Sequence, residues 1–112
     1  MKVYQVIADF GEYEDAREYT VGIWEDEDIA NYEKELYISN VNHLKAKLKP
    51  IAIEMDLDYN NLTEEEYFQK YNYDYEGNIR SALYDIENFN FCKVKEIEIN
   101  KRLVDITEQY KV

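Results

Sequence analysis

Val3-Tyr4-Gln5-Val6-Ile7-Ala8-Asp9-Phe10 is the stretch that decides the fold, together with the two segments that follow it. It is rich in β-branched and aromatic residues, which favour a strand. A polar run at 11–16, Gly-Glu-Tyr-Glu-Asp-Ala, suits a turn, and residues 18–24, Glu-Tyr-Thr-Val-Gly-Ile-Trp, have the composition of a second strand. Because a short polar connection joins two strand-like segments, we expect an antiparallel hairpin.

A helix is expected directly after this hairpin. The acids of residues 25–28 precede a run with helical spacing, and Asp26 or Asp28 can cap its first turn. The apolar positions of this run are Ile29, Tyr32, Leu36, Tyr37, Val41, Leu44 and Leu48. Pro50 predicts that the helix ends there, as one helix or as two broken near residues 39–40.

The remaining segments predict further helices and one late strand. Residues 51–55 suit a strand or an extended link, and residues 56–61 suit a turn. Thr63 and Glu66 match a capping box, which predicts a short helix through about Tyr71. An acidic, aromatic loop at 71–77, a helix at 78–87, a strand at 91–100 and a strand or helical turn at 103–110 follow. The apolar face of the late strand switches between Val94 and Ile97, so we expect either a bulge or a two-faced strand there.

These segments together predict a single α+β domain over residues 1–112. The N-terminal hairpin and the late strand would form a small antiparallel sheet packed against two or three helices. A length of 112 residues is typical of one domain.

The composition is strongly acidic. The 112 residues include 25 acids and 13 bases, for a net charge of −12, while 46% are hydrophobic and 15% aromatic. So much apolar content argues against a disordered tail. Direct binding to nucleic acid or to an anionic membrane is disfavoured, because such ligands require a basic surface. No run approaches the ~20 apolar residues of a membrane span.

The charge is concentrated in two blocks. Residues 1–37 hold eleven acids and three bases, net −8, and residues 54–91 hold ten acids and two bases, also net −8. Residues 38–53 hold three lysines and no acid. Cys92 is the only cysteine, so no intrachain disulfide can form, which fits a reducing, cytosolic setting.

No residue pattern points to catalysis or to a cofactor. The glycines are isolated and cannot form a phosphate-binding loop. His43, the only histidine, lies among lysines that indicate an exposed helix position, and Cys92 suits a small core residue. We therefore expect no enzyme, no catalytic residue and no metal site.

One metal alternative stays open at residues 54–66. Asp56, Asp58 and Asn60 have the spacing of calcium-loop positions 1, 3 and 5, but Asn61 and Tyr67 replace the glycine and glutamate of positions 6 and 12.

Tyrosine is the more distinctive signal. Tyr67, Tyr71, Tyr73 and Tyr75 lie within nine residues beside Asp74 and Glu76, and Tyr13 lies among acids. Tyrosine is enriched at interfaces because it combines a large apolar area with few rotamers and a polar tip. The alternative is that several of these rings cover the core.

Part of the chain resembles small, mostly uncharacterised proteins of phages and prophages of Gram-positive bacteria. The matching segments are Val3-Tyr4, Gly11 to Asp15, Val21 to Trp24, Asp26 to Ala30, and Val94 to Ile99. They cover about half of the chain and leave residues 38–90 without a counterpart. The resemblance implies a small α+β fold and a phage context, and it implies no catalytic residues.

These observations lead to an acidic inhibitor as the expected function. It would bind a host nucleic-acid-processing or defence protein through a basic groove, by nucleic-acid mimicry of the anti-CRISPR or anti-restriction type. The alternative is a non-enzymatic accessory or adaptor protein whose acids serve solubility only. The expected partner-binding residues are Glu12, Tyr13, Glu14, Asp15, Glu25, Asp26, Glu27, Asp28, Glu64, Glu65, Glu66, Tyr71, Tyr73, Asp74, Tyr75 and Glu76.

Overall fold

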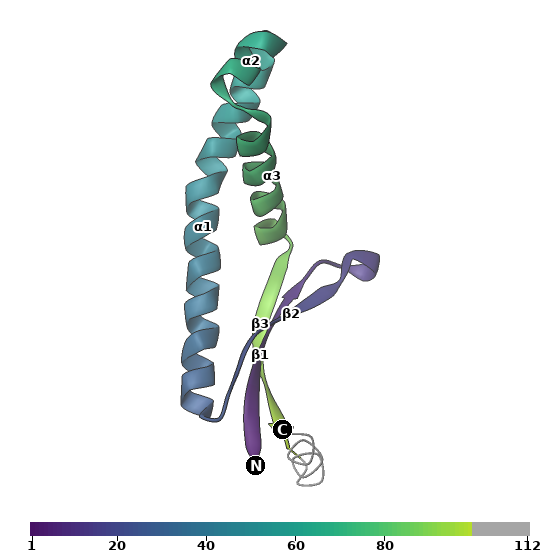
Figure 1. Ribbon diagram of the computed structural model, residues 1–112, viewed down its shortest axis with the longest axis vertical. Helices are drawn as coiled ribbons and strands as arrows, with labels where there is room; N and C mark the ends of the chain where they lie inside the picture. Colours follow the sequence, from purple (N-terminus) through teal and green to yellow (C-terminus); the bar gives the residue numbers. More distant parts are fainter. Residues whose placement is uncertain (100–112) are drawn as a thin grey trace, which may run out of the picture. The chain divides into compact units, whose positions relative to one another are not determined.

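The computed structural model describes residues 1–99 and confirms an α+β fold (Figure 1). Three strands form an antiparallel sheet in the order β2-β1-β3, and three helices lie between β2 and β3 in the sequence. The elements are β1 (Lys2–Phe10), the short 3-10 helix η1 (Tyr13–Asp15), β2 (Arg17–Trp24), α1 (Glu27–Asn61), α2 (Glu64–Lys70), α3 (Tyr73–Glu87) and β3 (Phe89–Glu98). The element expected at 103–110 lies outside the described residues.

The chain divides into two compact units. The first comprises residues 1–38 together with residues 90–99 of the described chain, and the second comprises Ser39–Phe89. The first unit therefore holds the sheet and the start of α1, while the second holds the rest of α1 with α2 and α3. Such a division describes contacts and not independent folding, so the single domain over 1–112 stays a prediction.

The core of the first unit lies on the central strand. Val6, Ile7 and Ala8 of β1 are buried, as are Ala30 at the start of α1 and Cys92 of β3. Cys92 is thus a small core residue, as the sequence indicated. Val6 pairs with Gly22 and Ile7 with Thr20, so Val21 is an extra residue that forms a bulge in β2.

The core of the second unit is an aromatic cluster. Met55 of α1, Tyr67 of α2 and the adjoining Tyr71 are buried together. The half-buried residues packed against them are Ile51, Leu62, Phe68 and Ile79. These contacts join the end of α1 to α2 and α3.

Helix α1 runs through Pro50 to Asn61, so the predicted helix end at Pro50, the link at 51–55 and the turn at 56–61 were wrong. Residues 39–40 are also helical, which removes the predicted break. Proline removes one hydrogen bond, to the Ala46 carbonyl, and both residues are exposed, so water can satisfy that carbonyl. Ala52 and Met55 are buried, and this packing stabilises the helix beyond the proline.

Helix α3 begins at Tyr73, and the loop predicted over 71–77 was therefore wrong from residue 73 onward. The Asn72 side chain accepts a hydrogen bond from the Tyr75 amide at 2.7 Å and caps the helix. The predicted capping box is confirmed, because the Thr63 and Glu66 side chains exchange hydrogen bonds with each other's backbone amides at 3.2 Å. Asp26 is the cap of α1.

Candidate partner-binding surfaces

The turn between β1 and β2 holds the first group of predicted residues. Gly11 has a φ of +75°, and a Cβ atom there would lie 2.3 Å from the Asp15 carbonyl oxygen, so the tight turn requires glycine. The Asn90 side chain donates to the Gly11 carbonyl at 2.7 Å and to Asp9 Oδ1 at 2.8 Å. The turn is thus fixed to the start of β3.

Tyr13 lies at the tip of this turn. Its side chain is 94% exposed, and its φ of 53° lies in the left-handed region. That region is uncommon for any residue with a bulky side chain, and holding one there costs about 1–2 kcal/mol. The turn therefore presents an exposed aromatic ring on a strained backbone.

Three exposed carboxylates surround Tyr13, those of Glu12, Glu14 and Asp15. Within residues 1–99, none of the three forms an ion pair. We call residues 12–15 the η1 turn. Its side chains make no contribution to the buried core, so their composition is not explained by packing.

A second acidic group lies at the start of α1. Asp26 Oδ1 accepts hydrogen bonds from the amides of Asp28 at 2.8 Å and Ile29 at 3.2 Å. Glu25, Glu27 and Asp28 are exposed and form no ion pair with a described cation. Carboxylates at a helix start also stabilise the helix, so this group has a structural role.

The two acidic groups of the first unit lie at opposite ends of β2. The η1 turn precedes Arg17 and the start of α1 follows Trp24, so the eight residues of the strand separate them (Figure 1). At about 3.3 Å per residue, the separation is about 26 Å. The first acidic block of the sequence is thus two groups in space.

The exposed acids of the second unit that were predicted to bind a partner lie at two further helix starts. Glu64 and Glu65 are exposed in the first turn of α2, and Asp74 is exposed in the first turn of α3. Glu66 accepts hydrogen bonds from Thr63, which lower the pKa of its carboxyl group. The helix dipole favours all four carboxylates at these positions.

Tyr73 and Tyr75 are exposed, as expected of partner-binding residues, but Tyr71 is not. The Tyr73 ring stacks on Phe68 with the centroids 4.2 Å apart, and the Tyr75 ring stacks on Tyr71 at 6.3 Å. Tyr71 is only 7% exposed and donates a hydrogen bond from its hydroxyl to Asp58. The prediction of a surface anchor at Tyr71 is corrected, because its ring covers Met55 in the core.

Glu76 is half-buried and forms hydrogen bonds within the second unit. Its Oε1 accepts from the Tyr67 hydroxyl and from Arg80 Nε, both at 3.0 Å. Arg80 also donates to Asp56 Oδ1 at 2.9 Å. These hydrogen bonds join α1, α2 and α3. The pKa of Arg80 is raised by its hydrogen bonds with Tyr67, Glu76 and Asp56. Glu76 therefore has a structural role in connecting the helices, and its partner-binding role stays a prediction.

Asp58 forms a parallel set of hydrogen bonds. Lys70 donates to its Oδ2 at 2.7 Å, and the Tyr71 hydroxyl donates to the same oxygen. Both hydrogen bonds stabilise the ionised carboxylate and lower its pKa, while the pKa values of Lys70 and Tyr71 are raised.

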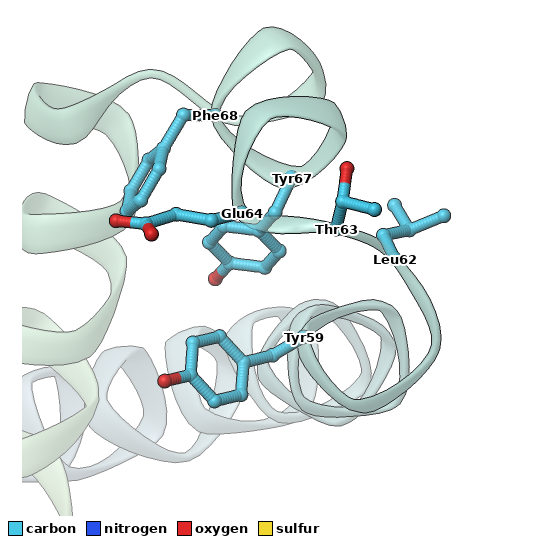
Figure 2. Close-up of a pocket in the computed structure, with 6 residues that line it drawn as sticks. All are labelled: Tyr59, Leu62, Thr63, Glu64, Tyr67 and Phe68. Atoms are coloured by element: carbon cyan, nitrogen blue, oxygen red, sulfur yellow. The ribbon is translucent and has the colours of Figure 1, made fainter.

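An open pocket of about 390 Å³ lies between the end of α1 and α2 (Figure 2). It is lined by Tyr59, Leu62, Thr63, Glu64, Tyr67 and Phe68. Figure 2 shows the Tyr59 ring directed from α1 toward Tyr67, whose centroid is 5.5 Å away with the ring planes at 88°. Aromatic rings beside the Glu64 carboxylate suit an apolar or cationic side chain of a partner. The lining has no nucleophile with an adjacent base, so its chemistry is binding.

The structure contradicts the calcium loop that the spacing at residues 54–66 suggested. Asp56, Asp58 and Asn60 lie in helix α1, whereas a calcium loop of that spacing is not helical. Among the described residues, no three histidine, cysteine or acidic side chains are grouped to hold a metal ion. His43 is exposed, as its lysine neighbours indicated. No helix within residues 1–99 has both the length and the apolarity to cross a membrane.

Sequence reasoning missed the internal hydrogen bonds and the pocket. Glu76 and Arg80 have the i,i+4 spacing of a helical ion pair, and this signal could have been read once α3 was placed over them. The hydrogen bonds of Asp56 and Asp58 could not be predicted in this way, because the sequence predicts a helix end at Pro50 and a turn over residues 56–61. The pocket depends on the packing of α2 against α1, which no local pattern encodes.

Comparison with known proteins identifies no relative: no protein-family model, no curated protein and no solved structure matches the chain.

Proposed function

We propose that this chain is an acidic inhibitor of phage type that binds a nucleic-acid-processing or defence protein of the bacterial host. Its exposed carboxylates would occupy positions where that protein binds phosphates, and its exposed tyrosines would provide apolar contacts. The protein would act in the cytoplasm of the host without a catalytic step.

The η1 turn is the observation that carries this proposal. Tyr13 is held exposed on a strained backbone between Glu12 and the carboxylates of Glu14 and Asp15. Backbone strain that the core does not require is typical of functional segments. An exposed aromatic ring inside an acidic rim matches the anchor-and-rim arrangement of protein interfaces.

The spacing of the acidic groups is compatible with mimicry of a duplex. The η1 turn and the start of α1 are about 26 Å apart along β2. On a nucleic-acid strand, which carries one phosphate per roughly 3.4 Å, this corresponds to about eight steps. A basic groove could therefore engage both groups of the first unit at once.

Capture from a host lysate tests the proposal. The full chain, immobilised, should retain a nucleic-acid-binding protein at about 50 mM salt and lose most of it at about 300 mM, because screening shortens the range of the charges. Duplex DNA added as a competitor should release the same protein. Capture that is insensitive to both salt and DNA would contradict mimicry.

Matched variants locate the binding surface. Replacing Glu12 and Glu14 by Gln and Asp15 by Asn removes three charges from the η1 turn. The control replaces Glu35, Glu87 and Glu96 by Gln, which removes the same charge from other exposed positions. We expect the first variant to weaken capture at least about tenfold and the control to leave it within about threefold.

Exposed tyrosines favour the accessory or adaptor function as a second candidate. Tyr13 and Tyr73 could anchor a protein partner by themselves, with the acids contributing only solubility. In that case Tyr13→Ala would abolish capture while the charge-neutral turn variant retained it. Tyr13→Gly adds a fold control, because glycine relieves the positive φ and should not destabilise the chain.

A further inference from the structure

The outer face of α1 in the second unit carries an apolar stripe that the core does not use. Ala46, Pro50, Ile53 and Leu57 succeed one another at intervals of four, three and four residues. Ile53 is 53% exposed and Leu57 is 57% exposed, and Ala46 and Pro50 are exposed as well. Met55, on the opposite face of the helix, is fully buried. The interval pattern is that of a helix seam that packs against another helix.

Charged residues flank this stripe in a fixed order. Lys47 and Glu54 each follow a stripe residue and lie on one flank, while Lys49 and Asp56 each precede one and lie on the other. On each flank the basic residue is nearer the N-terminus and the acidic residue nearer the C-terminus. A helix with this order is complementary to itself when a second copy runs in the opposite direction.

We propose that residues 42–61 of α1 form the interface of an antiparallel homodimer. In this register Ala46 lies opposite Leu57 of the second copy, and Pro50 lies opposite Ile53. A two-fold axis then relates the copies, so equivalent flanks meet.

The charges select this register. Lys47 lies opposite Glu54 of the second copy and Lys49 lies opposite Asp56, which gives four attractive pairs by symmetry. A shift of one heptad in one direction opposes Lys47 to Lys47 and Lys49 to Lys49. A shift in the other direction opposes Glu54 to Glu54 and Asp56 to Asp56. Both shifted registers are repulsive, so the charge order excludes them.

A parallel pairing is less complementary. It would bring Lys49 beside Glu54 of the second copy, but it would leave Lys47 beside Asn42 and Asp56 beside Asn61. Only half of the attractive pairs would remain. The antiparallel arrangement thus uses all four charged positions.

The flanking side chains are accessible for these contacts. Lys47 and Lys49 are exposed and form no ion pair within the described part of the chain. Glu54 and Asp56 accept from Lys70 at 3.5 Å and Arg80 at 2.9 Å, yet their side chains are 64% and 63% exposed. Each carboxylate therefore retains free acceptor positions for a second cation. This surface is distinct from the η1 turn and does not rest on the proposed function.

Sedimentation equilibrium of the full chain tests the dimer. At about 100 μM the wild-type chain should have the mass of a dimer. Lys47→Glu replaces two attractive pairs by two repulsive ones and should weaken association at least about tenfold. Lys45→Glu makes the same charge change at an exposed position off the seam and should leave association within about twofold.

A charge swap distinguishes the orientations. The double variant Lys47→Glu, Glu54→Lys restores opposite charges in the antiparallel register, so association should return to within about threefold of wild type. In a parallel pair, Lys49 would face the new lysine and association would stay weak. The swap removes the 3.5 Å contact of Glu54 with Lys70, whereas the 2.7 Å ion pair of Lys70 with Asp58 does not involve either exchanged residue.

Three results would overturn the antiparallel dimer: a wild-type monomer at about 100 μM, an equal loss in the Lys45→Glu control, or a swap that fails to restore association. Circular dichroism of each variant shows whether it is folded. If the Lys47→Glu variant or its charge-swapped partner unfolds, the comparison is repeated on the other flank. The single variant is then Lys49→Asp, and the double variant is Lys49→Asp, Asp56→Lys. The expected loss and recovery of association, and the results that would overturn the dimer, are the same.

Discussion

Removal of the Tyr67 hydroxyl should destabilise the second unit by about 1.5–2 kcal/mol. Tyr67 is 1% exposed, and its hydroxyl donates to Glu76 Oε1 at 3.0 Å. A hydrogen bond to a charged group contributes about 1.5–3 kcal/mol. The lower part of that range applies, because Glu76 keeps its 3.0 Å contact with Arg80 and its side chain is 20% exposed to water. Phenylalanine preserves the ring, so the contacts with Phe68 remain.

Urea unfolding followed by circular dichroism measures the effect of Tyr67→Phe. The matched control is Tyr59→Phe, since Tyr59 lies in edge contact with Tyr67 but is 65% exposed. Its hydroxyl accepts and donates no hydrogen bond within residues 1–99, so this variant should stay within about 0.5 kcal/mol of wild type. Thermal melting should show the same order, with Tyr67→Phe lower by about 6–16 °C at 4–8 °C per kcal/mol.

A double-mutant cycle decides whether the hydroxyl acts through Glu76. Glu76→Gln alone should destabilise the unit, and the combination with Tyr67→Phe should be less destabilising than the sum by about 1 kcal/mol. If Tyr67→Phe unfolded at the same urea concentration as Tyr59→Phe, or if the two changes were additive, the hydrogen bond would not stabilise the fold and the reasoning would be refuted.

Four further predictions follow from the turns, caps and carboxylates. Gly77→Ala should stabilise the chain by about 0.5–1 kcal/mol in urea unfolding, because Gly77 is inside α3 and a Cβ there meets nothing within 4 Å. Gly11→Ala should have the opposite sign and exceed about 1 kcal/mol, since its φ is +75° and the added carbon would meet the Asp15 carbonyl. Thr63→Ala should lower the free energy of unfolding by about 1 kcal/mol through loss of the α2 cap. The pKa of Asp58 is lowered in the folded chain by hydrogen bonds from a lysine and a tyrosine. The ionised Asp58 carboxylate therefore stabilises the fold above its ordinary pKa of 3.8, and this stabilisation is lost as the pH falls through the lower pKa of the folded chain. We expect Asp58→Asn to reduce the slope of the free energy of unfolding against pH below about 3.8.

The sequence predicted correctly those elements whose boundaries are set by neighbouring residues in the chain. The two N-terminal strands follow from β-branched residues around a glycine turn, and the α2 start follows from Thr63 and Glu66. The failures share a different cause. Pro50 is a helix breaker in local terms, but the burial of Ala52 and Met55 is a tertiary effect that outweighs the loss of one backbone hydrogen bond.

The same distinction between local and tertiary effects explains which of the predicted surface residues are exposed. The acids of the η1 turn and of the three helix starts are exposed, as a polar run before an element indicates. Tyr71 and Glu76 could not be told from their neighbours, because the sequence does not show which side of α3 or its cap packs on Tyr67. The apolar positions of α1 divide as well: Val41 and Leu48 are half-buried, while Ile29 and Leu36 are exposed.

Helix starts account for most of the acids that the sequence singled out. Asp26 caps α1, Glu66 completes the α2 capping box, and Asp74 lies in the first turn of α3, where a negative charge stabilises the helix. Their presence therefore needs no partner. The η1 turn is different, because its three residues of 3-10 helix are too short to gain from a helix dipole and bury no side chain.

A strained Tyr13 among unpaired carboxylates is thus the acidic feature for which the fold supplies no reason. Neutralising the acids of the helix starts would alter stability and binding together, and the two effects could not be separated. Neutralising Glu12, Glu14 and Asp15 should leave stability unchanged or slightly raised, because it removes repulsion from a chain of net charge −12. A loss of partner binding in that variant, with an unchanged urea midpoint, would show that the η1 turn recognises the partner. If binding were unchanged, the tyrosines would be the anchors and the acids of the turn would serve only solubility.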